Sequence, residues 1–247
     1  MSKRMVALIP ARAGSKRVAD KNIYRLSDHP LIAYTISAAL DSKIFDAVIV
    51  STDSEEYAKI AKYYGAEVPF LRPKEFASDT SPDIEWVNYT LETLMGSHRE
   101  FDYFSILRPT SPLRTAETIK RAYREFLASQ PVDSLRAVEP CTQHPAKMWS
   151  IVDNRLIPIM RRKDAGVDWF SSPTQSLPEV WAQNASLEIA HVHCVRDFHS
   201  ISGSEIVPFM TEFPEGLDVN RPDDLLHLEK LVKNSQVFLP DVKSEPY

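Results

Sequence analysis

The first half of the chain alternates short apolar runs with segments of helical character, and this alternation constrains the fold more than any other feature. The apolar runs are residues 5–9, 47–52 and 103–107. Uncharged runs of this length are typical of strands that are buried on both faces of a parallel sheet. We therefore expect an α/β fold with a mainly parallel central sheet and helices on both faces.

Residues that start and stop helices fall between these runs. Ser54 is a good N-cap for the segment that ends at Gly65, and Thr115 is an N-cap for the segment that follows it. The pattern predicts helices at 31–40, 55–64, 83–95, 115–128 and 223–233, and further strands at 67–70, 134–138 and 187–195. In sheets of this kind ligands bind where parallel strands end, so the loops after the apolar runs are the places to search.

Composition narrows the classes of function. The formal charge is −5, from 29 Lys and Arg against 34 Asp and Glu, which does not suit general nucleic-acid binding. The two cysteines, Cys141 and Cys194, form neither a CxxC nor a zinc pattern. No apolar run reaches the length of a membrane span. We expect a cytoplasmic protein that binds neither nucleic acid nor membrane.

The alternating pattern breaks down in the middle of the chain. Residues 140–180 are loop-like and carry Trp149, Trp169 and Phe170, and a turn at Asn154 predicts a hairpin. No repeat or linker divides the sequence. We therefore predict one domain over residues 1–247 with an insertion at about 140–180.

The loop after the first apolar run is the strongest candidate for chemistry. It places four cations within ten residues, together with a glycine and a serine: Arg12, Lys16, Arg17, Lys21, Gly14 and Ser15. Small residues let backbone N–H groups turn toward an anion, and cations neutralise oxyanions, so the loop can hold a phosphate chain. Charge alone fits an exposed basic loop equally well, but the position after a buried strand favours phosphate binding.

Two motifs carry a resemblance to a known family. The run Ile9–Arg17, continued by Asp20–Asn22, and the run Leu107–Arg114 resemble the cytidylyltransferases that make CMP-sialic acid and related CMP-nonulosonates. Weaker motifs follow in the family's order at 72–73, 78–80, 144–147 and 216–225. The resemblance spans about residues 5 to 230.

This resemblance implies a nucleotide-diphospho-sugar transferase-like, Rossmann-like fold with an inserted dimerisation arm. It implies that CTP is coupled to a 2-keto-3-deoxy sugar acid, giving a CMP-sugar for cell-surface glycans and pyrophosphate. It also implies Mg²⁺ or Mn²⁺ and a homodimer. Two alternatives stay open: a same-fold transferase for a sugar 1-phosphate or another nucleotide, and a non-catalytic binder of nucleotide or sugar.

The resemblance also assigns roles to residues. The catalytic residues are Arg12 and Lys21, which contact the triphosphate. The nucleotide-binding residues are Ala11, Gly14, Ser15, Asn22, Arg72, Ser78, Asp79 and Thr80. The candidates for acceptor binding are Arg108, Lys147, Gln175, Asn184 and Glu188. The candidate metal ligands are Asp218 and Asn220, whose oxygen atoms suit Mg²⁺.

Some positions depart from the family pattern. Arg108 stands where relatives commonly carry Gln, and Glu188 adds an anion near the expected acceptor pocket. We therefore expect a variant eight- or nine-carbon sugar acid as acceptor, with N-acetylneuraminate a poor substrate. Asp223 and Asp224 fit a helix N-terminus. His191 and His193 alternate on the predicted strand, but without a third ligand we expect a structural role for them.

Overall fold

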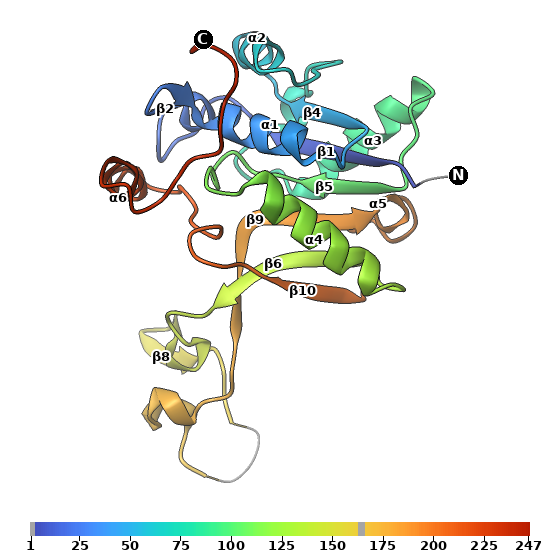
Figure 1. The fold of residues 1–247 in the computed structure, drawn as a ribbon. Helices are drawn as coiled ribbons and strands as arrows, with labels where there is room; N and C mark the ends of the chain where they lie inside the picture. Colours follow the sequence, from blue (N-terminus) through green and yellow to red (C-terminus); the bar gives the residue numbers. More distant parts are fainter. Residues whose placement is uncertain (1–2, 163–165) are drawn as a thin grey trace. The chain divides into compact units, whose positions relative to one another are not determined.

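The computed structural model describes residues 3–162 and 166–247, which divide into two compact units. The first unit contains residues 3–137 and 184–247 and carries the central sheet (Figure 1). The second unit is formed by residues 138–183. The second unit is therefore an insertion in the sequence of the first.

The first unit is built on a six-stranded sheet with strand order β10-β6-β9-β5-β1-β4. The strands are β1 (Met5–Pro10), β4 (Ala47–Ser51), β5 (Tyr103–Ile106), β6 (Ser134–Pro140), β9 (Trp181–His191) and β10 (Ile206–Met210). β1 pairs in parallel with both β4 and β5, which confirms the predicted parallel core. β9 runs antiparallel to β5, so the whole sheet is mixed.

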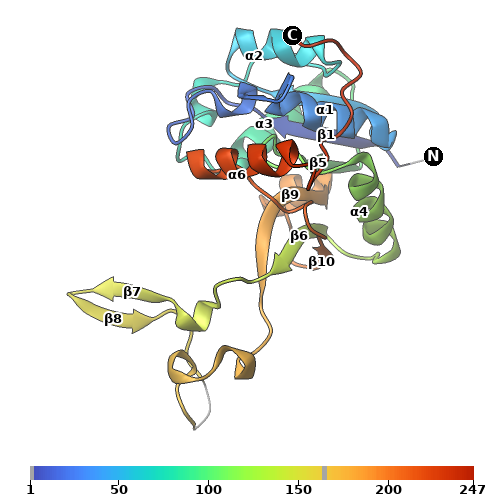
Figure 2. The same ribbon diagram turned by 60° about the vertical axis from the view of Figure 1, so that its left-hand side comes forward.

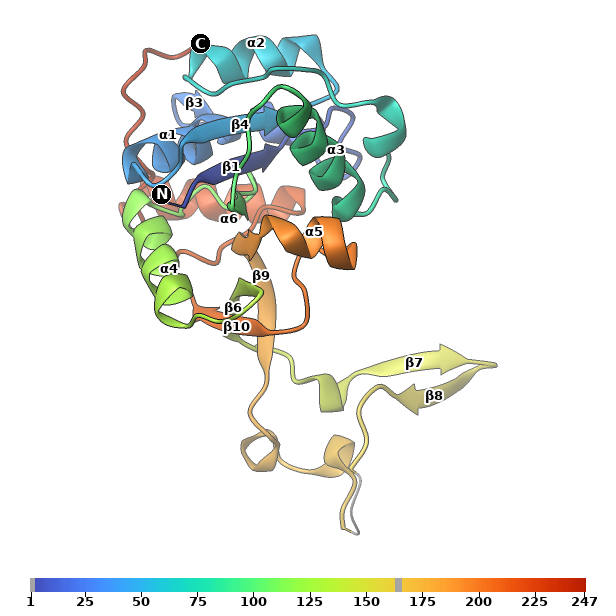
Figure 3. The ribbon, with the colours of Figure 1, turned by 90° about the vertical axis from the view of Figure 1, so that its right-hand side faces the viewer.

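Helices cover both faces of the sheet, as predicted (Figure 3). They are α1 (Leu31–Ser42), α2 (Glu55–Tyr63), α3 (Asp83–Gly96), α4 (Ala116–Ala128), α5 (Val192–Phe198) and α6 (Pro222–Lys233). Alternate β1 side chains divide between the faces: Ala7 and Ile9 pack with α1 and α4, whereas Val6 and Leu8 pack with α3 and α5. Within the described ranges, no helix has the length and hydropathy needed to cross a bilayer.

The expected helix starts are confirmed. The Ser54 side chain accepts a hydrogen bond from the Tyr57 backbone N–H, and Thr115 forms a capping box with Thr118. Each cap satisfies backbone donors that the first helical turn leaves unpaired. These local signals fix where α2 and α4 begin.

Two predicted strands are wrong in part. Residues 67–70 contribute only a single parallel bridge, between Glu67 and Ile49. The strand expected at 187–195 ends at His191, and α5 begins at Val192. Val192 and Val195 both pack against the core from α5, and this spacing of three fits a helix rather than a strand. His191 and His193 therefore do not share one face of a strand.

The second unit contains the hairpin expected around Asn154. β7 (Trp149–Val152) pairs antiparallel with β8 (Arg155–Pro158), as Figure 2 shows. Asp153 and Asn154 have φ angles of 49° and 60°, which suit a type I′ turn. The unit also contains the short 3₁₀ helices η3 (Pro145–Lys147), η4 (Trp169–Ser171) and η5 (Thr174–Ser176).

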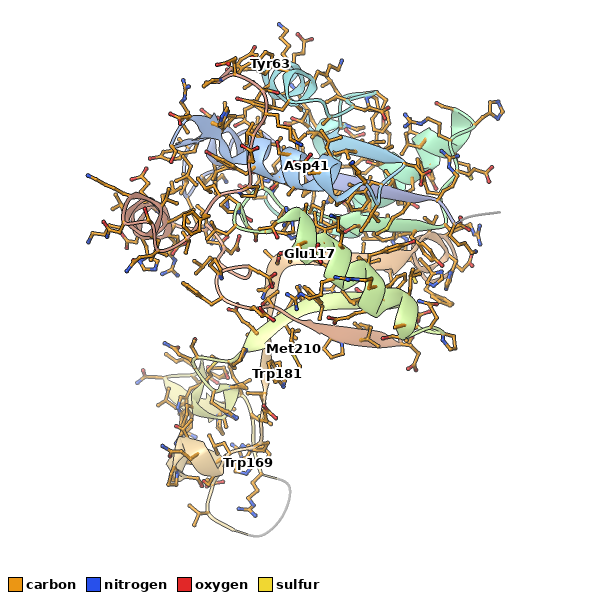
Figure 4. All side chains as sticks on the ribbon, viewed as in Figure 1. Asp41, Tyr63, Glu117, Trp169, Trp181 and Met210 are labelled. Atoms are coloured by element: carbon orange, nitrogen blue, oxygen red, sulfur yellow. The ribbon has the colours of Figure 1, made fainter. Side chains whose placement is uncertain are left out.

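The C-terminal segment packs along α1 and α2. Lys243 Nζ lies 2.5 Å from Asp41 Oδ1, and the Tyr247 ring packs edge-on against Tyr63. The Tyr247 backbone N–H donates to Tyr64 Oη at 3.1 Å. Figure 4 labels Asp41 and Tyr63, the helix residues that this segment contacts.

The core of the first unit generates a stability prediction. Phe126 of α4 is fully buried against Tyr103, so Phe126→Ala should lower the free energy of unfolding by about 3–5 kcal/mol through lost burial and a cavity. Its neighbour Leu127 is 42% exposed, and Leu127→Ala should change that energy by less than about 1 kcal/mol. Urea denaturation followed by circular dichroism measures both. Similar costs for the two variants would contradict this assignment of the core.

Candidate active site

The parallel strands end at one edge of the sheet, and a pocket of about 220 Å³ lies there. Its lining comes from the loops after β1 and β5, from residues 72–81 and from the first turn of α3. Eight of the predicted site residues line it: Arg12, Ser15, Lys21, Asn22, Arg72, Ser78, Asp79 and Arg108. Two of the three loops indicated by the sequence, those after β1 and β5, thus meet at this cavity.

The loop after β1 is held in place by hydrogen bonds to its backbone. The Ala11 N–H donates to Ser51 O at 2.9 Å, and the Ala13 N–H donates to Asp53 Oδ1 at 2.8 Å. Asn22 Nδ2 donates to Arg12 O at 3.1 Å. Gly14 has a φ of 72°, a conformation that favours glycine. Ala11, Gly14 and Asn22 therefore shape the loop that carries the cations.

Lys21 lies at the C-terminal end of this loop, in the short 3₁₀ helix η1 (Lys21–Ile23). Its ammonium group donates to Val219 O at 3.0 Å. Burial lowers the pKa of Lys21, and the charge of Asp218 opposes this shift. The contacts place a fixed cation between the loop and residues 218–219.

Arg72 is a second fixed cation, and it is only 5% exposed. Its Nε donates to Ser51 Oγ at 3.0 Å and its guanidinium donates to Ser51 O at 2.7 Å. The guanidinium also lies 4.8 Å from the centre of the Trp86 ring. Burial lowers the pKa of Arg72 to about 10, so the side chain stays charged at neutral pH.

The Asp79 carboxylate pairs with two cations of the loop after β1. It lies 2.6 Å from the Arg12 guanidinium and 2.5 Å from Lys16 Nζ. Hydrogen bonds from Lys16 and Arg12 hold the pKa of Asp79 below its usual range. The Ser78 hydroxyl lies 3.3 Å from that of Thr80. The Asp79 carboxylate therefore competes with any anionic ligand for Arg12 and Lys16.

Arg108 is held by two carboxylates at the pocket. Its guanidinium lies 2.7 Å from Asp83 Oδ2 and 2.9 Å from Glu188 Oε1. The pairing of β5 with β9 places Glu188 opposite Ile106, two residues before Arg108. The other oxygen of Glu188 lies 3.0 Å from the Arg136 guanidinium. Glu188 thus holds a residue that lines the pocket, and both of its carboxylate oxygens already lie beside an arginine.

Asp218 has one oxygen that fits a cation. Oδ2 accepts a hydrogen bond from Asn220 Nδ2 at 2.5 Å, whereas Oδ1 is buried and has no hydrogen-bond partner among the described residues. In this arrangement the amide nitrogen of Asn220, not its oxygen, faces Asp218. Asp224 accepts the backbone N–H groups of Asn220 and Arg221 at the start of α6, which confirms its expected role at a helix N-terminus.

Of the five residues predicted to bind the acceptor, Arg108 lines this pocket, whereas Lys147, Gln175, Asn184 and Glu188 do not. Lys147 and Gln175 belong to the second unit, and Lys147 Nζ donates to Phe170 O and Ser172 O there. Asn184 Nδ2 donates to Thr211 Oγ1, and its Oδ1 accepts the Ser186 N–H, so its side chain fixes the backbone of β9. A role for these residues in acceptor binding stays a prediction.

Sequence reasoning missed several residues that position the site. Arg114 is fully buried and donates to Ser186 O, to Thr35 Oγ1 at 3.0 Å and to Arg108 O at 3.3 Å. It therefore ties the loop after β5 to β9. The position of Arg114 at the end of the Leu107–Arg114 motif could have indicated this role. In the same way, the position of Asp53 directly after a strand could have indicated its contact with the Ala13 N–H. Nothing local to Asp83 or Arg136 indicated that they would contact Arg108 and Glu188.

The position of Asp79 generates a prediction about anion affinity. Asp79→Asn removes the carboxylate that competes for Arg12 and Lys16, so the variant should bind inorganic triphosphate several-fold more tightly than the unchanged protein. Isothermal titration calorimetry measures the affinity. Glu92→Gln, which removes the same charge from the exposed side of α3, controls for net charge and should leave it unchanged. Unchanged or weaker binding by Asp79→Asn would refute the competition.

The chain is similar to proteins of known activity. The sequence profile of the cytidylyltransferase family matches residues 6–164. The chain is 34% identical to the CMP-N,N'-diacetyllegionaminic acid synthase of Legionella pneumophila, over 96% of this chain and 99% of that protein. It is 44% identical to the N-acylneuraminate cytidylyltransferase of Escherichia coli O18:K1:H7, over 51% of this chain and 29% of that protein.

A solved structure shares the fold. The CMP:2-keto-3-deoxy-manno-octonic acid synthetase, determined in complex with CTP, superposes with a TM-score of 0.67 at 13% sequence identity. The match covers 94% of this chain and 99% of that one. The profile and the relative matched over 96% of this chain show the family, and the solved structure shows the fold. The chain belongs to the cytidylyltransferase family, and it is an enzyme of the nucleotidyltransferase class.

Proposed function

We propose that this cytidylyltransferase couples CTP to a nine-carbon 2-keto-3-deoxy sugar acid and releases pyrophosphate. The observation that carries the proposal is the pocket at the parallel strand ends, where Arg12, Lys21 and Arg72 are fixed around a space open to a ligand. The full-length similarity to a CMP-diacetyllegionaminic acid synthase supports the acceptor class. The product would serve the synthesis of cell-surface glycans, and use of CTP fits a cytoplasmic enzyme.

The positive charges in this pocket suit the transfer of a cytidylyl group from CTP. A hydroxyl oxygen of the sugar acid gives up its proton to solvent and attacks the α-phosphorus of CTP, and the bond from that phosphorus to the bridging oxygen breaks. Negative charge grows on the departing pyrophosphate. Lys21, held by Val219 O, is a fixed donor to its oxygens, and Arg12 is a second donor in exchange for its contact with Asp79. Each such donor can lower the barrier by ~3 kcal/mol. Arg72 adds positive charge at the floor of the same pocket.

Asp218 is the residue that would hold Mg²⁺ or Mn²⁺. Its buried Oδ1 has no hydrogen-bond partner among the residues described, and a carboxylate oxygen suits either ion. The ion, when bound, neutralises phosphate oxygens. Asn220 orients the other oxygen of Asp218 by a hydrogen bond. Its role as a second ligand, through its carbonyl oxygen, stays part of this proposal.

Arg108 is proposed to select the acceptor. Asp83 and Glu188 fix its guanidinium, and the side chain still lines the pocket. A guanidinium donates only, so it favours an acceptor that presents carbonyl or carboxylate oxygens at this position. A second acylamino group supplies such a carbonyl. This contact favours a diacylamino sugar acid over N-acetylneuraminate.

The second unit is proposed to form a homodimer. Its hairpin exposes apolar side chains on both strands, and Ile151 is 74% exposed and Leu156 59%. Trp149 and Trp181 are also partly exposed in this unit, and Figure 4 labels Trp181. Exposed apolar surface of this kind is typical of a protein interface.

Steady-state kinetics test the function and the acceptor together. Pyrophosphate release should require CTP among the four nucleoside triphosphates and a nine-carbon sugar acid. The kcat/KM for a diacylamino acid should exceed that for N-acetylneuraminate by more than about tenfold, a difference of ~1.4 kcal/mol. Equal kcat/KM values for the two acceptors would contradict the proposed selection of the acceptor by Arg108. Turnover with a sugar 1-phosphate would favour the alternative transferase. Absence of turnover with every acceptor would favour the non-catalytic binder.

The catalytic cations generate a second prediction. Arg12→Ala and Lys21→Ala should each lower kcat/KM by about 100-fold or more, because the growing charge on pyrophosphate loses a donor. Both side chains come from a loop, so the thermal midpoint should change little. Lys59→Ala, an exposed lysine of α2, is the control and should retain full activity. Near-normal turnover in either loop variant would exclude that residue from the reaction.

A third prediction concerns assembly. The unchanged protein should behave as a dimer at micromolar concentration in light scattering. The double variant Ile151→Asp/Leu156→Asp should be a monomer, because both substitutions bury charge in the proposed interface. Leu226→Asp places a charge on the exposed face of α6 and should remain dimeric. A dimer that survives the double substitution would rule out the hairpin as the interface.

A further inference from the structure

A cluster of potential metal ligands lies at the edge of the sheet opposite the pocket. The pocket is at the end of β5, after Ile106, whereas Tyr103 at the start of β5 pairs with His191. The chain enters α5 directly after His191, and the Asp133 carbonyl accepts the His191 N–H at 3.1 Å. Asp133, which precedes β6, and the first turn of α5 therefore meet across the sheet from the proposed reaction.

Three different ligand groups meet at this place. They are the Asp133 carboxylate, the His193 imidazole and the Cys194 thiol, whose ligand atoms all lie within 4.8 Å of one another. His193 Nε2 is 3.5 Å from Asp133 Oδ1 and 3.9 Å from Cys194 Sγ. Tetrahedral zinc, with bonds of about 2.0–2.3 Å, separates such ligand atoms by roughly 3.3–3.6 Å. The two distances from His193 Nε2 are within a few tenths of an ångström of these separations.

The surrounding structure already orients these groups. Asp133 Oδ2 accepts the backbone N–H groups of Ser204 and Glu205 at 2.7 and 3.0 Å, which leaves Oδ1 turned toward His193. Cys194 is fully buried, and its Sγ lies 3.6 Å from Asp133 O. Because these groups are held before any ion arrives, binding costs little ordering of side chains.

We propose that Asp133, His193 and Cys194 form a zinc-type metal site that is separate from the site of nucleotidyl transfer. Carboxylate, imidazole and thiolate are the three ligand types that zinc uses in proteins. The His193 side chain is 36% exposed, so water can reach the fourth position. The ion would link α5 to the start of β6 and stabilise the folded chain.

Binding must displace a proton from the thiol. Burial raises the pKa of Cys194 to about 11, so the group is a thiol at neutral pH when no ion is bound. The metal takes the place of that proton, which passes to solvent. The alternative role of the cluster is purely structural, with an Asp133–His193 ion pair beside a buried thiol.

A titration of tag-free, chelator-treated full-length protein distinguishes these roles. Zinc competing with a chromophoric chelator should bind with one equivalent and raise the thermal midpoint. Cobalt in its place should give the near-ultraviolet absorption of a thiolate–metal bond. His193→Gln and Cys194→Ser should weaken zinc binding by more than about tenfold, and Cys194→Ser should abolish the cobalt absorption.

Two controls keep the test specific. Cys141→Ser removes the other thiol, and Asp218→Asn removes the carboxylate proposed for the metal of the reaction; both should retain the zinc equivalent. His193 is partly exposed, so His193→Gln should fold even if Cys194→Ser does not, and circular dichroism of the metal-free variants checks this. Absence of tight zinc binding by the unchanged protein, or equal binding by His193→Gln, would overturn the proposal.

Discussion

Parallel pairing of β1 with both β4 and β5 is the constraint on which the site depends. It forces three strands to end at one edge, so the loops that follow them meet although they are far apart in sequence. A contact between two of these loops joins the Ala13 N–H to the Asp53 carboxylate. The backbone contacts place the loops, and side-chain contacts such as those of Lys21 with Val219 O and of Arg72 with Ser51 fix the cations.

Pairing with carboxylates offsets the repulsion among the cations of this pocket. The chain carries a formal charge of −5, yet its pocket gathers arginines and lysines that repel one another. Carboxylates offset this repulsion: Asp79 pairs with Arg12 and Lys16, while Asp83 pairs with Arg108. The exposed Asp79 pairs are easily exchanged for other anions, whereas the pair of Arg108 with the buried Glu188 carboxylate is costly to break. The ion pairs on the Asp79 side of the pocket can therefore be exchanged for a ligand, whereas the ion pair of Arg108 on the other side stays in place.

The sequence predicted those features that local patterns determine. The strands of the parallel core, the caps at Ser54 and Thr115, and the cationic loop all follow from residues close together in the chain. The switch from strand to helix at Val192 was missed, because its cause is packing of Val192 and Val195 on a distant core. The contacts of Asp133 with His193 and Cys194 depend on strand order, which no local pattern encodes. The packing of the C-terminal segment on Tyr63 and Tyr64 is nonlocal in the same way.

The two departures from the family pattern at the pocket are best understood as one change. A buried Glu188 needs a cationic partner on each oxygen, and Arg108 and Arg136 supply them. A glutamine at position 108 would leave Glu188 with weaker compensation, and an apolar residue at 188 would leave Arg108 with Asp83 as its remaining carboxylate among the described contacts. Each substitution alone therefore leaves a buried charge poorly paired, while the two together preserve the pairing and add donors to the pocket. Arg108 and Glu188 therefore form one charged unit, and we expect a substitution at either position to need compensation at the other.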